Sequence, residues 1–218
     1  MTQYESARTH MITSQLRPNK IADPRLLAAF AAVRRELFVP PSLRAVAYVD
    51  DDLPVAGGRA LMRPLFAGAL LLAAAARPTD KALVVGAGTG YEAALLGLLA
   101  KSVVALEEDE RLARMARFAL AEERALAVSV VEDVLAKGHR ARAPYEVIFF
   151  AGAIAEVPQE IEAQLAEGGR LVAVLRRREE IGHGVLMTRM PAALGRRILF
   201  DADIPFLPGF APEHAFSF

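Results

Sequence analysis

The chain of 218 residues contains no cysteine and no tryptophan, and it has only four histidines. Without cysteine, disulfide scaffolds, thiolate zinc sites, iron–sulfur ligation and cysteine nucleophiles are all excluded. A surplus of charge is also missing, because 26 Lys and Arg residues balance 26 Asp and Glu residues. A sequence-independent nucleic-acid binder needs a cationic surplus to displace counterions. We therefore expect no nucleic-acid partner.

Long hydrophobic runs are absent as well. The longest is LFAGALLLAAAA at residues 65–76, which is too short to span a bilayer. The polar N-terminus lacks the apolar segment of a signal peptide. The composition, with 54% hydrophobic and 24% charged residues, is that of a chain with a full core. We expect a folded cytoplasmic protein with no membrane partner.

Residues 1–78 are dominated by helical patterns. Asp23 is placed as the N-cap of a helix over 24–33, with Pro24 at the first helical position. Gly57 and Gly58 mark a loop, and residues 59–76 are typical of a buried helix that ends near Pro78. We predict that this first region is a small helical cap.

Residues 79–218 have a different sequence pattern, because runs rich in Val, Ile and Phe alternate with segments of helical periodicity. The predicted strands are 82–85, 103–106, 128–131, 147–150 and 171–175, and the predicted helices are 91–100, 110–124 and 157–167. Continuous apolar strands are typical of a parallel sheet covered on both faces. Residues 185–190 and 197–200 predict an antiparallel hairpin at one edge, followed by an irregular tail over 201–218. The region is therefore an α/β, Rossmann-like domain with a mostly parallel, doubly wound sheet.

The segment LVVGAGTGY at residues 83–91 runs from a predicted strand into glycines and then a helix. Gly86 and Gly88 allow a sharp turn and the close approach of a ligand, and Gly90 allows tight packing of the helix. Glu107 follows the next predicted strand, 21 residues after Gly86. This spacing suits a carboxylate that binds ribose hydroxyls, so the pattern predicts a nucleoside-containing cofactor.

The glycine spacing distinguishes between cofactors. Dinucleotide sites use G-x-G-x-x-G, with a pyrophosphate at the helix N-terminus. Here the pattern is G-x-G-x-G, and the following helix carries Glu92, which is unfavourable beside a pyrophosphate but tolerable near a cationic cofactor. This favours an S-adenosylmethionine-dependent methyltransferase. A dinucleotide site and a glycine-rich turn without a ligand are the alternatives.

Several further segments resemble the protein-L-isoaspartate O-methyltransferase family in order. They are residues 11–16, 21–27, VRRELFVP at 33–40, 47–54, the glycine segment at 86–91, and QLAEGGRLV at 164–172. The resemblance implies a class I Rossmann-like methyltransferase fold with an N-terminal helical cap. It also implies S-adenosyl-L-methionine as cofactor, with S-adenosyl-L-homocysteine as its product, and methylation of isoaspartyl carboxylates of peptides or proteins, which starts protein repair.

The cofactor-binding residues implied by the resemblance are Gly86, Ala87, Gly88, Tyr91, Glu107, Glu108 and Asp133. Gly86 and Gly88 would pass beneath the methionine part of the cofactor. Glu107 would hold the ribose, and Glu108 would sit beside the adenine. Asp133 matches the Asp of the family's G-D-G turn near the adenine amino group, although both flanking glycines are replaced.

The substrate loop departs from the family. Its pattern is approximately G-Q-T-I-S-x-P, whereas this chain has GRALMRP at residues 58–64. Ala60 replaces the Thr and Met62 replaces the Ser, so both hydroxyls beside the transferring methyl group are lost. Guanidinium groups match carboxylate geometry, which makes Arg59 and Arg63 candidates to hold an anionic substrate. Solvated or helix-capping roles are the alternative for these arginines.

No catalytic residue is assigned, because a carboxylate acceptor is already ionised and needs positioning and desolvation more than a general base. Two alternatives to isoaspartyl methylation follow from the altered loop. One is a catalytically diverged S-adenosylmethionine-binding protein, and the other is a methyltransferase acting on another small anionic substrate. No metal is expected, since the acidic run at residues 50–52 lacks further ligands at coordinating spacing.

Overall fold

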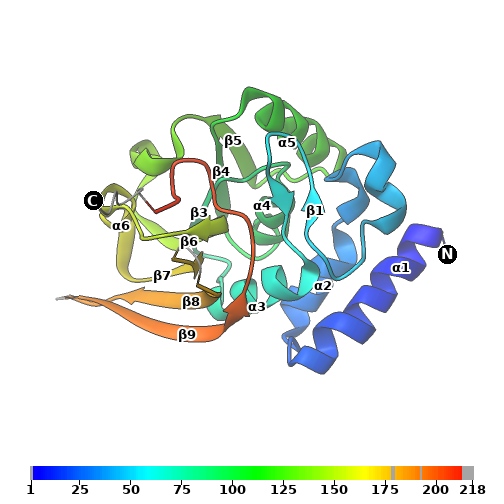
Figure 1. The fold of residues 1–218 in the computed structure, drawn as a ribbon, viewed down its shortest axis with the longest axis horizontal. Helices are drawn as coiled ribbons and strands as arrows, with labels where there is room; N and C mark the ends of the chain where they lie inside the picture. The colour runs from blue at the N-terminus through cyan, green and yellow to red at the C-terminus, as the bar shows by residue number, and fades with distance from the viewer. Residues whose placement is uncertain (1, 178–179, 192, 213–218) are drawn as a thin grey trace, which may run out of the picture.

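A seven-stranded sheet forms the centre of the computed structural model, which describes residues 2–177, 180–191 and 193–212 (Figure 1). Its strands are β3 (Lys81–Val85), β4 (Ser102–Glu107), β5 (Val128–Glu132), β6 (Tyr145–Ile154), β7 (Leu165–Leu175), β8 (Gly182–Arg189) and β9 (Leu194–Ala202). They are ordered β5-β4-β3-β6-β7-β8-β9. Strands β3 to β7 are parallel, while β8 and β9 are antiparallel to their preceding neighbours. The predicted doubly wound sheet with an antiparallel edge hairpin is confirmed.

Helices cover both faces of the sheet. The α4 (Tyr91–Gly97) and α5 (Glu110–Glu122) helices pack in the same core as α2 (Pro24–Ala32) and α3 (Pro64–Ala74). The opposite core is lined by the short turn η5 (Leu135–Lys137) and by α6 (Gln159–Glu162), and η6 (Arg140–Arg142) lies between them in sequence. The chain winds outward in opposite directions from β3 and β6. In such sheets, ligands bind at the carboxyl ends of these two strands.

The N-terminal region is helical as predicted. It begins with α1 (Gln3–Met11), which continues into the π-helix η1 (Ile12–Leu16), and the 3-10 helices η2 (Arg17–Asn19), η3 (Arg35–Leu37) and η4 (Pro41–Val46) flank α2. Asp23 caps α2, because its Oδ1 accepts a hydrogen bond from the Leu26 backbone N–H at 2.8 Å. One hydrophobic core contains residues from the cap and from the sheet. A domain boundary at residue 78 stays a prediction.

Two predicted helices are shorter than their apolar patterns. The helix expected over 59–76 begins only at Pro64, because β2 (Ala60–Leu61) pairs with β1 (Leu53–Pro54) in a small hairpin. The helix expected over 157–167 is restricted to α6, and Leu165 pairs with Tyr145 as the start of β7. Ile161 and Leu165 have helical spacing, but pairing with β6 gives Leu165 a strand conformation.

The tail after β9 crosses the carboxyl end of β6 as irregular chain (Figure 1). The Leu207 N–H donates to the Ala153 carbonyl, and the Ala153 N–H donates to the Pro205 carbonyl, both at 2.9 Å. Residues 213–218 of the predicted tail lie outside the described residues. Within the described residues, every helix is too short or too polar to cross a membrane. The cytoplasmic location stays a prediction.

Candidate active site

The glycine loop connects β3 to α4 at the point where the strand order reverses. Gly86 has φ +70° and Gly88 has φ +56°, which is the left-handed region that favours glycine. A Cβ atom on Gly86 would lie 2.6 Å from the Leu207 side chain and 2.9 Å from Arg59 Nη2. A Cβ atom on Gly88 would meet nothing within 4 Å. Two side chains therefore cover Gly86, while the surface over Gly88 is open.

Glu107 ends β4 and is completely buried. Its Oε2 accepts a hydrogen bond from the Gly88 N–H at 2.7 Å, and its Oε1 accepts from the N–H groups of Glu108 and Asp109, both at 3.1 Å. Asp109 in turn caps α5 through the Leu112 N–H. These contacts fix the carboxylate between the glycine loop and the start of α5. The residue expected to hold the ribose is thus tied to the loop expected to pass beneath the methionine.

Arg59 lies directly beside this carboxylate. It precedes β2, and its side chain is only 5% exposed. Nη1 lies 3.3 Å from Glu107 Oε1 and 3.2 Å from Oε2, and Nη2 donates to the Gly86 carbonyl at 2.5 Å. Sequence reasoning assigned Arg59 to the substrate and Glu107 to the cofactor. The structure brings the two residues together in a buried ion pair.

The substrate loop faces a very small cavity of about 10 Å³. Its lining residues are Asp52, Arg59, Ala60, Met62, Ala151, Gly152, Ile204, Pro205 and Phe206. A volume of this size corresponds to about one water-sized probe. None of the described lining residues carries a hydroxyl group. The replacement of both expected hydroxyls is therefore not compensated from the tail or from β6.

Arg63 points to the acidic run at residues 50–52. Its backbone N–H donates to Asp52 Oδ1 at 2.7 Å, and its Nη2 lies 3.1 Å from Asp51 Oδ1. The guanidinium carbon also lies 4.8 Å from the centre of the Phe66 ring. Within the described residues, no group of three or more His, Cys, Asp or Glu side chains is arranged for a metal. The sequence suggested only an exposed acidic loop here and missed its contacts with Arg63.

The remaining predicted cofactor residues lie in different environments. Ala87 is in the glycine loop, and its N–H donates to the Leu106 carbonyl at 2.9 Å. The Tyr91 ring is completely buried and packs edge-on against Phe30 and Phe38 of the cap. Glu108 and Asp133 are exposed on the loops that follow β4 and β5. Glu108 and Asp133, both expected near the adenine, therefore lie on the loops after two paired strands, while the Tyr91 side chain packs in the core.

The VRRELFVP motif contributes two buried charged residues whose roles the sequence did not reveal. Arg35 donates to the carbonyl groups of Ala47 and Met62, at 2.6 and 2.8 Å. Glu36 accepts a hydrogen bond from the Tyr48 hydroxyl and pairs with Arg8 at 3.4 Å. The signal in the sequence was a pair of charges inside an apolar motif. In the structure Arg35 joins the cap to the substrate loop, and Glu36 makes its contacts within the cap.

Glu92 lies in the first turn of α4 and is only 2% exposed. Its Oε1 has no hydrogen-bond partner among the described residues. Burial raises the pKa of its carboxyl group to about 7, and the charges of Arg35 and Arg59 oppose this shift. Sequence reasoning considered Glu92 only as a neighbour of a cationic cofactor. The structure shows a buried carboxyl group whose pKa is raised by burial and lowered in part by the charges of Arg35 and Arg59.

Comparisons with known proteins match most of the chain to one family. The sequence profile of the protein-L-isoaspartate(D-aspartate) O-methyltransferase family matches residues 6–185. A protein-L-isoaspartate O-methyltransferase of Koribacter versatilis is 40% identical over 172 residues, which is 79% of this chain and 78% of that protein. Another from Rhodopseudomonas palustris is 34% identical over 203 residues, which is 93% of each protein.

Solved structures show the same fold. A Plasmodium falciparum protein-L-isoaspartate O-methyltransferase in complex with S-adenosyl-L-homocysteine has a TM-score of 0.79 at 16% identity, covering 94% of this chain and 98% of that chain. A second protein-L-isoaspartate O-methyltransferase has a TM-score of 0.81 at 21% identity, covering 93% of this chain and 66% of that one. The predicted class I methyltransferase fold is thereby confirmed.

Proposed function

Because the chain belongs to the protein-L-isoaspartate(D-aspartate) O-methyltransferase family, we propose that it methylates the carboxylate of isoaspartyl residues in peptides or proteins. It is an S-adenosylmethionine-dependent O-methyltransferase. The observation that carries the proposal is the buried carboxylate of Glu107, which is bonded to the glycine loop at the sheet's switch point. The resulting methyl ester would start the repair of the abnormal residue.

The donor and acceptor groups at this edge fit S-adenosylmethionine. Glu107 offers a buried carboxylate for ribose hydroxyls, and the uncovered backbone at Gly88 permits close approach. Glu108 and Asp133 are the residues proposed to lie near the adenine. Arg59 and Leu207 must turn away from Gly86 to make room. Since both obstacles are side chains, the glycine loop itself keeps its conformation.

The cofactor, when bound, supplies an electrophilic methyl group on a sulfonium centre. An acceptor carboxylate is ionised at neutral pH, so the protein's task is to orient it and exclude water. Met62 and Phe206 enclose the small cavity beside Arg59, which favours a desolvated acceptor. The Arg59 guanidinium is the proposed partner for the acceptor's negative charge. This requires no general base.

A second candidate function is methylation of another small anionic substrate. It is favoured by Ala60 and Met62, which leave the described lining of the cavity without a hydroxyl group while an arginine lies beside it. Under this alternative the cofactor site is the same. Only the group opposite the methyl donor differs.

The two candidates are separated by methyl transfer to matched acceptors. One pair consists of peptides of identical sequence that contain either isoaspartate or aspartate, and a third set consists of small dicarboxylic acids. We expect methyl ester on the isoaspartyl peptide and none on the aspartyl peptide. Transfer to the small acids alone would support the second candidate. Binding of S-adenosylhomocysteine without transfer to any of them would contradict both and identify a catalytically diverged binding protein.

A further inference from the structure

The Arg59 guanidinium occupies the surface on which the cofactor is proposed to lie. Its Nη2 atom is 2.5 Å from the Gly86 carbonyl, and Nη1 is within 3.3 Å of both Glu107 oxygens. Arg59 reaches this position from the β1–β2 hairpin, which is 48 residues away from Glu107 in sequence. The same side chain also lines the small cavity with Met62. Arg59 therefore lies between the cofactor surface and the acceptor cavity.

The hydrogen-bonding capacity of Glu107 is already used. An ionised carboxylate accepts about four hydrogen bonds. Three backbone N–H groups, from Gly88, Glu108 and Asp109, occupy three of these positions. Arg59 Nη1 takes the remaining position, so a ribose hydroxyl cannot bond to the carboxylate while the guanidinium stays. Ribose and Arg59 are competitors for one carboxylate.

We propose that S-adenosylmethionine displaces Arg59 from Glu107 and that the displaced guanidinium then binds the carboxylate of the acceptor. This inference rests on the proposed function and adds an order of binding to it. A buried guanidinium that loses its carboxylate partner is strongly destabilised until another anion replaces it. Asp52, the acidic residue of the cavity lining, already accepts from the Arg63 N–H. The anion that completes the site is the acceptor's carboxylate.

Specificity follows from the charges. With the cofactor bound, the site holds a sulfonium and the Arg59 guanidinium, which are both cations. A carboxylate relieves this repulsion, whereas a neutral or cationic acceptor does not. Coupling between two ligands is reciprocal, so an anionic acceptor also strengthens cofactor binding by the same factor. Arg59 thereby selects anionic acceptors and admits them after the cofactor.

Calorimetric titration with S-adenosylhomocysteine tests the competition directly, because it needs no turnover. We expect Arg59→Ala to bind it more tightly than wild type, by about 5- to 150-fold, the range typical of coupled sites. Arg34→Ala removes a partly exposed arginine that pairs with Glu123 instead of Glu107. This matched control should bind as wild type does. Arg59→Gln keeps a hydrogen-bond donor and decides the test if the alanine variant does not fold.

A second titration contains a saturating isoaspartyl peptide. The peptide should strengthen binding of S-adenosylhomocysteine to wild type and have no effect on Arg59→Ala. Equal or weaker binding by the folded Arg59 variants, compared with wild type, overturns the inference and leaves the proposed function intact. Failure of every variant and of wild type to bind S-adenosylhomocysteine overturns the proposed function, and with it the inference.

Discussion

Arg35 donates a hydrogen bond from Nη2 to the carbonyl oxygen of Met62 across 2.8 Å. Its Nε donates to the Ala47 carbonyl at 2.6 Å, and the guanidinium carbon lies 4.8 Å from the centre of the Tyr91 ring. One completely buried side chain therefore joins the cap, the substrate loop and the helix that follows the glycine loop. The position of the loop depends on this residue.

Replacing Arg35 should destabilise the whole protein. In Arg35→Met, two buried carbonyl groups lose their donor, and we expect a loss of about 2 to 5 kcal/mol in the free energy of unfolding. Urea denaturation measures this change. The neighbouring Arg34 is 43% exposed and pairs with Glu123, so Arg34→Ala should cost less than about 1 kcal/mol. Equal losses in the two variants would contradict the role assigned to Arg35.

Glu92 should make stability depend on pH. Burial raises the pKa of its carboxyl group from 4.5 to about 7, so the folded protein favours the protonated form. The contribution of Glu92 to the free energy of unfolding is therefore fully present below pH 4.5 and is lost as pH rises through about 7. Glu92→Gln removes this loss, and we expect it to be more stable than wild type at pH 8, by on the order of 3 kcal/mol.

Urea denaturation at pH 5 and pH 8 measures the effect of Glu92→Gln. The advantage of the variant should shrink at pH 5, because wild type is then largely protonated at this position. Glu122→Gln, which neutralises an exposed glutamate of α5, provides the control for a change in net charge. An advantage of the same size at both pH values would show that Glu92 does not titrate as assigned.

Restoring the two missing hydroxyls should increase isoaspartyl methylation. In Ala60→Thr/Met62→Ser, both hydroxyls return to the lining of the cavity beside Arg59. Oriented donors at other active sites contribute about 10²-fold to the rate, and we expect a rise in kcat/KM of this order. Met62→Leu changes the buried side chain without adding a hydroxyl and should give no rise. An unchanged kcat/KM in the folded double variant would place the divergence elsewhere.

Leu207 from the tail should control entry to the glycine loop. A Cβ atom added to either Gly86 or Gly152 would lie 2.6 Å from the Leu207 side chain. We expect Leu207→Ala to unfold more easily by about 2 to 5 kcal/mol, because the residue is buried. Its association with S-adenosylhomocysteine in stopped-flow measurements should nevertheless be faster. Leu126→Ala, at a residue that is 96% exposed, should change neither quantity. A slower association in Leu207→Ala would contradict this role of the tail.

Much of the fold could be predicted from the sequence because the central strands are continuous apolar runs. The sequence also indicated the Asp23 cap, whose side chain accepts from the Leu26 N–H. The β1–β2 hairpin could not be predicted, since strands of two residues show no periodicity. The first residues of β7 were assigned to a helix, because the spacing of neighbouring apolar residues gives no information about the pairing of Leu165 with Tyr145.

The site was predictable to a similar degree. Glycines after a strand and Glu107 at the end of the next strand have a characteristic spacing, and the parallel topology brings them together. The Arg59–Glu107 contact joins residues 48 positions apart and depends on a hairpin that the sequence did not reveal. The approach of Leu207 to Gly86 likewise depends on the path of the irregular tail. Contacts of this kind are set by tertiary structure and have no local pattern.

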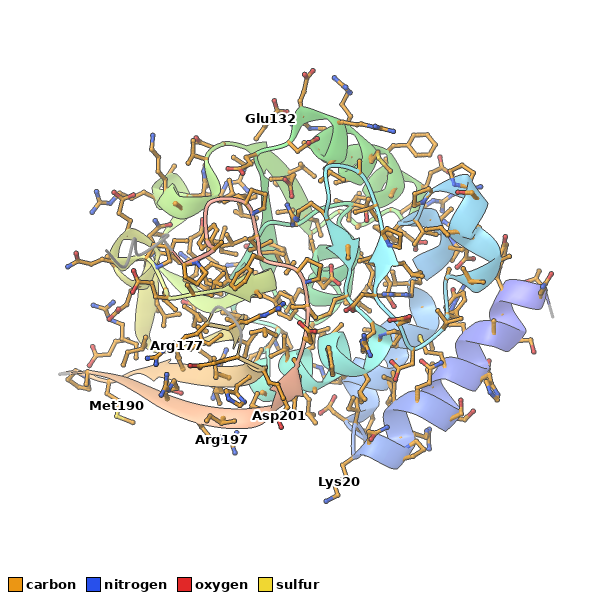
Figure 2. All side chains as sticks on the ribbon, viewed as in Figure 1. Lys20, Glu132, Arg177, Met190, Arg197 and Asp201 are labelled. Carbon is orange, nitrogen blue, oxygen red and sulfur yellow. The ribbon has the colours of Figure 1, made fainter. Side chains whose placement is uncertain are left out.

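The cofactor role of Glu107 is tested most directly by the transfer of labelled methyl groups from S-adenosylmethionine to an isoaspartyl peptide. Glu107→Ala is compared with Glu132→Ala, because Glu132 is the register partner of Glu107 at the end of β5 but lies on the surface (Figure 2). We expect wild type and Glu132→Ala to have the same kcat/KM. Loss of a hydrogen bond to a charged acceptor should reduce kcat/KM of Glu107→Ala by on the order of 10²-fold. Undiminished transfer by folded Glu107→Ala would contradict the assignment of Glu107 to the cofactor site, and no transfer by wild type would contradict the proposed function.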